Sequence, residues 1–231
     1  MKLFASVFVS NALTKATKYE VLPLQAYDKL DLPVATHADM LVFVLGKRIF
    51  CYDDYYNKNR RIFGVAEDDG YEIVRISPPI DSKYPNDVAL NVFKIGNFLV
   101  GNLKYVAKEI LEYANFLGLS LIDVKQGYSA CSTLVLDDNT AITADKSIFE
   151  ALAKIGKRVI LIDQGGIKLD GYDYGFIGGA SCVLDDTVYF FGDITKHQNY
   201  DKIHAAIEAL KMNEFSISCE DVFDFGGART F

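Results

Sequence analysis

Apolar strands separated by tight polar turns recur along the chain. Four segments each read as an apolar strand, a short turn and a second apolar strand: residues 39–54, 89–102, 127–145 and 175–193. The last two segments are the clearest pair, because the residues from Val135 to Asp138 and from Val183 to Asp186 both spell VLDD. The pattern predicts four β-hairpins, and their nearly even spacing indicates an internal repeat.

Helical periodicity follows the hairpins. Apolar positions recur with helical spacing in three stretches, at 103–118, 145–157 and 200–212. Asp145 is a plausible N-cap, and Gly118 and Gly156 are typical helix stops. Short apolar strands follow, at 119–124, 158–163 and 215–218. The repeated unit is therefore predicted to be ββαβ; its first copy is less regular, because residues 55–70 are polar and read as a loop.

The two ends of the chain each carry part of one more unit. Residues 222–231 read as the first strand of a hairpin whose second strand is missing. Residues 2–10 read as the second strand of a hairpin whose first strand is missing. The apolar run from Leu3 to Val9 superficially resembles a short signal peptide, but we interpret it as a strand because the repeat requires one there. Joined end to start, the two segments complete a fifth unit. We therefore expect one closed domain over residues 1–231, with no exposed sheet edges.

Composition and charge narrow the function classes. The 231 residues are 50% hydrophobic with a net charge of −7, which supports a large core and argues against nucleic-acid or anionic-membrane binding. No apolar run approaches the ~18 residues of a membrane span. The four cysteines form no C-x-x-C pair, so we predict reduced thiols in the cytoplasm and no zinc site. No dinucleotide, Walker or HExxH motif is present, so no cofactor or metal is predicted.

The repeat register points to candidate functional residues. Cys131 corresponds to Gly179, to about Ala89 and to about Asp39, with an uncertainty of one or two positions. These residues precede the inner strand of each hairpin, which faces the centre of a five-unit ring. Small residues there either leave room for a ligand or only let the units pack. Cys131 is accordingly either a nucleophile or a buried structural thiol.

Several acidic and small residues lie near these positions. His37 and Asp39 stand two apart, so in an extended segment both side chains point to one side, as a base beside a carboxylate. Carboxylates converging on one axis suit a cationic ligand such as a guanidinium or an amine; alternatively, Asp caps tight turns beside Gly. The predicted catalytic residues are Cys131, His37 and Asp39, and the predicted ligand-binding residues are Asp173, Asp224, Asn91, Gly178, Gly179, Gly226 and Gly227.

Several motifs resemble the hallmarks of an uncharacterised family assigned to the pentein, or guanidino-group-modifying-enzyme, fold of the amidinotransferase superfamily. They are GYSACST, AITADKSI, IKLDGYDYGFIGGAS, FFGDITKH and the terminal DFGGA, and together they extend over nearly the whole chain. The resemblance implies an α/β propeller of five pseudo-symmetric ββαβ units, closed by pairing of the N- and C-terminal strands. The superfamily contains arginine and agmatine deiminases, dimethylarginine hydrolases and amidinotransferases. It also contains a ribosome anti-association factor that is not an enzyme.

The resemblance leaves two functional classes open. In the enzymes a Cys nucleophile follows a His and a Gly-rich turn close to the C-terminus. Here the residues after Gly227 are Ala228, Arg229, Thr230 and Phe231, so that nucleophile has no counterpart. One expectation is a cysteine-dependent hydrolase or transferase acting on a guanidino or amidine compound in the central pore. The other is a non-catalytic protein that binds a small cation or a macromolecular partner. The sequence leaves the oligomeric state open.

Overall fold

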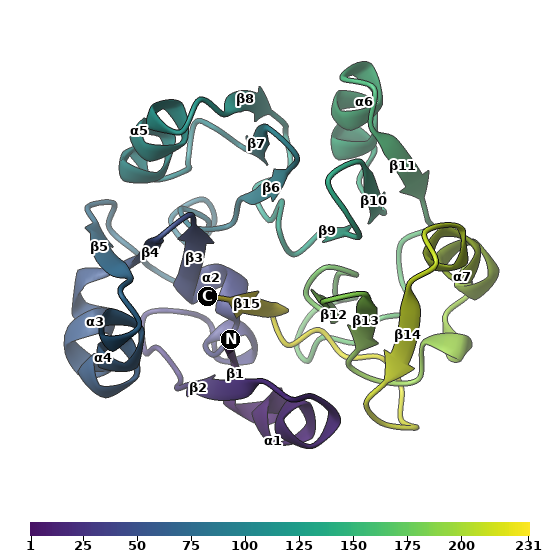
Figure 1. Cartoon of the computed structure of the whole chain (residues 1–231), viewed down its shortest axis with the longest axis horizontal. Coiled ribbons are helices and arrows are strands. Elements are labelled where there is room, and N and C mark those ends of the chain that lie inside the picture. Colours follow the sequence, from purple (N-terminus) through teal and green to yellow (C-terminus); the bar gives the residue numbers. More distant parts are fainter.

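A computed structural model describes residues 1–231, and its five small sheets surround a central axis (Figure 1). Each sheet has three strands, in the orders β15-β1-β2, β3-β4-β5, β6-β7-β8, β9-β10-β11 and β12-β13-β14. Helices α1 and α3 to α7 lie on the outside of the ring, whereas α2 lies near its centre (Figure 1). The predicted pentein-type α/β propeller of five units is confirmed.

The strand bounds follow the predicted hairpins and short outer strands closely. The strands are β1 (Lys2–Ser6), β2 (Glu20–Leu24), β3 (Val42–Leu45), β4 (Arg48–Tyr52), β5 (Glu72–Ile76), β6 (Phe93–Ile95), β7 (Phe98–Gly101), β8 (Ser120–Asp123), β9 (Thr133–Val135), β10 (Thr140–Thr143), β11 (Arg158–Leu161), β12 (Ser181–Leu184), β13 (Thr187–Phe190), β14 (Asn213–Ser216) and β15 (Ala228–Thr230).

The helices connect the middle strand of each sheet to its outer strand. They are α1 (Val7–Ala16), α2 (Ala38–Leu41), α3 (Asp53–Lys58), α4 (Arg60–Asp68), α5 (Lys108–Phe116), α6 (Lys146–Lys154) and α7 (Tyr200–Ala209), with short 3₁₀ turns at Leu32–Val34 and Ile194–Lys196. Only α2 is different, because it precedes the inner strand β3. The predicted N-cap of α6 is confirmed: Asp145 Oδ1 accepts a hydrogen bond from the Ile148 N–H at 2.9 Å.

Every unit repeats one pairing pattern. The inner strand pairs antiparallel with the middle strand, as in β3 with β4, and the middle strand pairs parallel with the outer strand, as in β4 with β5. Antiparallel strands can be joined by a tight turn, whereas parallel strands need a crossover, which the helix supplies. The inner and middle strands are mostly buried and the outer strands are partly exposed.

The two termini complete the fifth unit, as predicted. β15 pairs antiparallel with β1, with Leu3 opposite Thr230, and β1 pairs parallel with β2. The Phe231 N–H donates to the Lys2 carbonyl at 3.0 Å. The Phe4 and Phe231 rings stack with their centroids 4.5 Å apart. Both chain ends consequently lie near the centre of the ring (Figure 1).

Two local predictions are wrong. The strand predicted from Leu3 to Val9 ends at Ser6, where the Ser6 hydroxyl accepts from the Phe8 N–H at 3.3 Å and starts α1. Residues 55–70, predicted as a loop, are largely helical in α3 and α4. That segment buries only a narrow stripe, including Phe63 and Ala66, so most of its side chains are polar although its backbone is helical.

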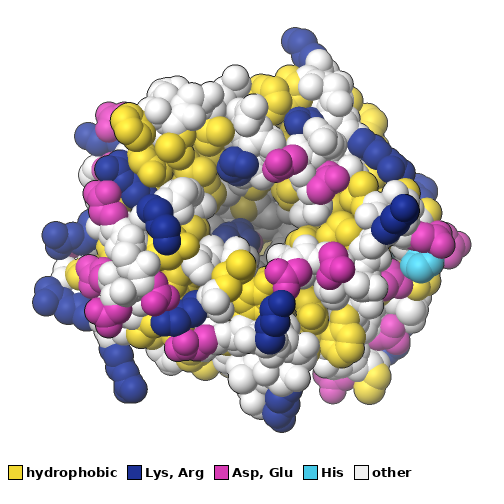
Figure 2. Space-filling view, viewed as in Figure 1, with side chains coloured by type: hydrophobic (Ala, Val, Ile, Leu, Met, Phe, Trp, Pro, Cys, Tyr) yellow, Lys and Arg dark blue, Asp and Glu magenta, His cyan; other side chains and the backbone are white.

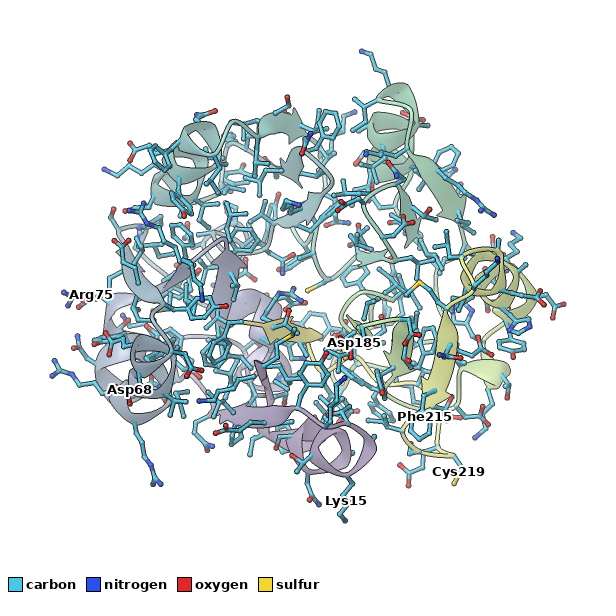
Figure 3. All side chains as sticks on the ribbon, in the orientation of Figure 1. Lys15, Asp68, Arg75, Asp185, Phe215 and Cys219 are labelled. Carbon is cyan, nitrogen blue, oxygen red and sulfur yellow. The ribbon has the colours of Figure 1, made fainter.

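The face in Figure 2 is hollowed at its centre, where the five sheets meet. Figure 3 labels one residue near this hollow, Asp185 in the turn between β12 and β13. The other labelled residues, Lys15, Asp68, Arg75, Phe215 and Cys219, lie toward the rim (Figure 3). None of the helices has the length and apolar character needed to cross a bilayer.

Candidate functional site

Hydrogen bonds from all five units form a closed ring around the axis, just before the inner strands begin. The Gly179 N–H donates to the Cys131 carbonyl (3.0 Å), and the Gly227 N–H donates to the Gly179 carbonyl (2.8 Å). The Asp39 N–H donates to the Gly226 carbonyl (3.1 Å). These backbone contacts join four of the five units.

The side chain of Asn91 joins the remaining unit to the ring. Its Oδ1 accepts from the N–H groups of Ala130 (2.8 Å) and Cys131 (3.2 Å), and its Nδ2 donates to the Asp39 carbonyl (3.3 Å). Asn91 is fully buried. The predicted register is thus correct within its stated uncertainty, since the second unit contributes Asn91 instead of Ala89. Asn91 holds the Cys131 and Asp39 segments side by side.

Cys131 and Asp39 are in direct contact. The Cys131 thiol donates to Asp39 Oδ2 at a distance of 2.8 Å, and Asn91 Nδ2 lies 3.1 Å from the sulfur. Burial raises the pKa of Cys131 well above its ordinary value, and Asp39 and Asp224 raise it further. The thiol is therefore neutral while no cation lies beside it, and a bound cation would favour its ionisation.

Asp39 is a carboxyl group kept away from water. It is 0% exposed, and burial raises its pKa to about 6 although Arg229 and His37 lower it. The Arg229 guanidinium approaches Asp39 Oδ2 only to 4.0 Å. Its other oxygen, Oδ1, is buried without a hydrogen-bond partner. Buried carboxylate oxygens are normally hydrogen-bonded, so this oxygen is an exception.

Asp224 and His37 form a second pair beside this one. His37 Nδ1 lies 3.7 Å from Asp224 Oδ1, and His37 Nε2 is buried without a partner. Asp224 accepts from the N–H groups of Phe176 (2.9 Å) and Gly226 (3.0 Å). Burial raises the pKa of Asp224, and these bonds and His37 offset part of that rise.

The expectation that His37 and Asp39 lie in an extended segment is wrong. His37 is the N-cap residue of α2, and Asp39 lies in the first turn of that helix. The helical turn forms because the Met40 N–H donates to the His37 carbonyl at 3.1 Å. Both side chains still reach the axial cluster, since Asp39 contacts Cys131 and His37 faces Asp224.

These groups face one cavity of about 240 Å³. His37, Cys131 and Asp224 line it, while Asp39 lies behind them in contact with Cys131. Asp173 also lines the cavity, from an exposed loop. Met40, Tyr128 and Phe176 contribute apolar and aromatic wall. A mostly apolar cavity with a few convergent polar groups is typical of small-molecule sites.

Gly178 and Gly179 allow the fourth unit to approach the axis. A Cβ at Gly179 would lie 2.0 Å from Asp224 Oδ1, and one at Gly178 would lie 2.4 Å from the carbonyl oxygens of Ala130 and Thr133. Any larger residue would displace these groups. The contacts explain both glycines by packing around the cluster, so a role in ligand binding stays a prediction.

Gly226 and Gly227 allow the fifth unit to approach the axis in the same way. A Cβ at Gly226 would lie 2.3 Å from the His37 Cβ, and both glycines have positive φ, 78° and 65°. Other residues rarely adopt that backbone conformation. Their contact with ligand also stays a prediction, but their positions let His37 and Asp224 meet.

Three residues near the cluster were not predicted. Tyr128 and Asp87 line the cavity and are hydrogen-bonded to one another, with the Tyr128 hydroxyl 2.6 Å from Asp87 Oδ2. Arg229 approaches Asp39 from the C-terminal strand. Tyr128 lies within the motif GYSACST and Arg229 directly follows the motif DFGGA, so these motifs could have indicated both residues. Asp87 lies in an irregular segment without any such signal.

No group of three or more His, Cys, Asp or Glu side chains is arranged to hold a metal ion. The cluster at the axis is instead a set of paired groups, thiol with carboxyl and imidazole with carboxylate. Acids, a thiol and an imidazole around one cavity can bind a planar cation and exchange protons with it.

Comparison with known proteins places the chain among proteins of this fold. A family profile described as "Family of unknown function (DUF6873)" matches residues 6–228. No curated protein sequence matches the chain significantly. Among solved structures, a mutant DDAH from Pseudomonas aeruginosa complexed with citrulline superposes with a TM-score of 0.60 at 11% identity, covering 94% of this chain and 91% of the other.

Two further structures have the same architecture. SxtG, an amidinotransferase of Microseira wollei from the saxitoxin biosynthetic pathway, has a TM-score of 0.59 at 11% identity, covering 94% of this chain and 76% of the other. An agmatine deiminase of C. jejuni has a TM-score of 0.53 at 11% identity, covering 93% and 75%. At this identity the likeness shows the fold, which is that of guanidino-group-modifying enzymes.

Proposed function

The chain belongs to the family of unknown function DUF6873, and from that premise we propose that it binds a small guanidino- or amidine-type cation in its axial cavity. One observation carries the proposal: two buried carboxyl groups, Asp39 and Asp224, flank the same thiol, and no Lys or Arg lies closer to them than Arg229 at 4.0 Å from Asp39. Buried acids without a full counter-charge are stabilised by a cation.

The shape of the ligand follows from the acceptors. A guanidinium or amidinium is planar and presents parallel N–H groups, which match carboxylate oxygens in pairs. Asp39 Oδ1 has no partner within the protein, and Asp224 lines the cavity. The planar head of the ligand would donate to Asp224, the charge of Asp39 behind Cys131 would add to the attraction, and the uncharged remainder of the ligand would contact Met40 and Phe176.

Catalysis by Cys131 is the second candidate, and the contact between Cys131 and Asp39 favours it. The thiol proton would move to Asp39 as the sulfur forms a bond to the amidine carbon and the C=N π pair moves to nitrogen. One C–N bond would then break, with the amine leaving after it takes a proton from Asp39 or His37. Water or an acceptor amine would attack the sulfur-bound carbon as it gives a proton to Asp39 or His37. The C–S bond would then break, and that proton would return to the sulfur to restore the Cys131 thiol.

Binding is tested by calorimetry and thermal shift with methylguanidine, acetamidine and butylguanidine. We expect wild type to bind at least one of them, and Asp224→Asn to lose about ten- to hundredfold in affinity, the worth of one charge-assisted hydrogen bond. Asp186→Asn, in an exposed turn that does not line the cavity, is the matched control and should bind as wild type does. If Asp224→Asn and Asp186→Asn bound the cation with equal affinity, the proposed binding site would be refuted.

Catalysis is tested separately by mass spectrometry of trapped adducts. Incubation with a cation that binds should add mass to Cys131 and release an amine, and Cys131→Ser should do neither. Cys219, which is exposed at the rim (Figure 3), serves as an internal control for non-specific modification. Binding without adduct or amine release would leave the chain as a binding protein.

A further inference from the structure

A second acidic group lines the cavity, separate from the axial cluster. Asp87 is 4% exposed, and its Oδ2 accepts from the Tyr128 hydroxyl at 2.6 Å. Its other oxygen, Oδ1, is buried and has no hydrogen-bond partner. No Lys or Arg forms a salt bridge with Asp87 within the protein. A buried carboxyl with one satisfied and one free oxygen lacks a positively charged partner.

Asp87 comes from a different unit of the ring than Asp39 and Asp224 do. It stands four residues before Asn91, which is the member of the axial ring from that unit. It makes its hydrogen bond to Tyr128, whereas Asp224 binds backbone N–H groups of the fourth and fifth units. Apolar lining residues, among them Met40, complete the same cavity. The cavity therefore offers two buried acids from different units, Asp87 and Asp224, and apolar wall.

The side chains that line the cavity include three acids, Asp87, Asp173 and Asp224, and no Lys or Arg. A ligand carboxylate in this cavity would have no Arg or Lys to pair with and would face like charges. Such a group is rejected strongly, because an unpaired buried charge is costly. The 240 Å³ of the cavity hold roughly eight non-hydrogen atoms at about 30 Å³ each, the volume of one water in the liquid.

We propose that the ligand is a small dication without a carboxylate: a guanidinium or amidinium that binds the axial carboxyl groups, joined by a short alkyl chain to an ammonium that binds Asp87. This inference rests on the proposed function and adds its substrate class. The ammonium pairs with the Asp87 carboxylate, and the methylene groups contact the apolar wall. An α-amino acid with the same guanidinium head is excluded by its carboxylate.

Three ligands test the inference on the wild-type chain, by calorimetry at low salt. Agmatine has both cationic groups, butylguanidine lacks the ammonium, and arginine adds a carboxylate. We expect agmatine to bind at least about tenfold more tightly than either of the others, the worth of one charge-assisted hydrogen bond. Arginine binding as tightly as agmatine, or butylguanidine binding as tightly as agmatine, would overturn the inference and leave the proposed function intact. No binding by any of them would instead overturn the proposed function.

Asp87→Asn tests the assigned residue. The amide keeps the shape and an acceptor for Tyr128 but removes the charge, so agmatine affinity should fall about tenfold, to that of butylguanidine. Butylguanidine affinity should change less than about twofold, which separates loss of the ammonium contact from general damage to the cavity. An equal loss for both ligands would refute a specific contact. The wild-type comparison stands even where this variant folds poorly.

Discussion

Replacing Asp39 with asparagine should stabilise the chain at neutral pH, although Asp39 lies at the centre of the candidate site. The Asp39 side chain is 0% exposed and its Oδ1 has no hydrogen-bond partner. Burial raises its pKa from 3.8 to about 6. A shift of that size corresponds to about 3 kcal/mol of destabilisation at neutral pH, since each unit of difference in pKa between the folded and unfolded chain is worth about 1.4 kcal/mol.

The sign of the pH dependence follows from the direction of the shift. Between pH 3.8 and about 6 the folded chain binds the Asp39 proton more tightly than the unfolded chain does. The stability from this group is therefore complete below pH 3.8 and is lost as pH rises through about 6. The amide side chain of the Asp39→Asn variant carries no charge at any pH. The variant should thus exceed wild type by about 1–3 kcal/mol at neutral pH, the lower value allowing for an unpaired amide N–H.

Urea unfolding of wild type and Asp39→Asn at about pH 4, 5.5 and 7.5 measures this difference. We expect the advantage of the variant to grow with pH and to level off above pH 6. Asp186→Asn, on an exposed turn, should show no such trend. A variant that is less stable than wild type at neutral pH, or a difference that is constant with pH, would refute the assignment of a destabilised buried carboxyl.

Further outcomes follow from other contacts around the axis. Asn91→Ala leaves two buried N–H groups and one carbonyl without partners and should lower the free energy of unfolding by about 3 kcal/mol or more; a loss below 1 kcal/mol would contradict the hydrogen-bonded ring. Gly179→Ala places a Cβ 2.0 Å from Asp224 Oδ1 and should cost at least about 2 kcal/mol in urea unfolding, so an unchanged midpoint would refute the packing. Iodoacetamide at about pH 8 should alkylate exposed Cys219 about a hundredfold faster than Cys131, whose pKa is raised by burial, and equal rates would show an open, ionised thiol. Cation affinity should rise with pH through about 6 as the Asp39 carboxyl ionises, and a flat profile in calorimetry would place the cation elsewhere.

Much of the fold was predictable because its signals are local. Alternating apolar strands, turn residues and helix stops mark each unit over a few tens of residues, and the half-units at both ends indicated closure. The errors came where local signals conflict with tertiary context. Val7 and Val9 are apolar and β-branched, yet they lie in α1, where Val9 is buried against the ring and Ser6 caps the helix. Residues 60–68 are polar because α4 buries only one stripe.

The sequence predicted several of the residues at the candidate site. The repeat register brought Cys131, Asp39 and Gly179 to equivalent positions, and the structure places all three in the axial ring. Their contacts were not predictable. The sequence also lacked any signal for Asp87, because its significance depends on its being a buried carboxyl group that lines a cavity without a cationic partner, which is a property of the assembled units.

From the sequence alone follow the repeat, the class of most of its strands and helices, and the joining of the two ends, since hydrophobic alternation and turn chemistry act over neighbouring residues. Tertiary structure decided that Cys131 lies 2.8 Å from the carboxyl of Asp39, which is 92 positions away in the chain. It also decided which acids lose contact with water. Both outcomes depend on the packing of all five units against one another, because a distance across the axis and the burial of a charge exist only once the ring is closed.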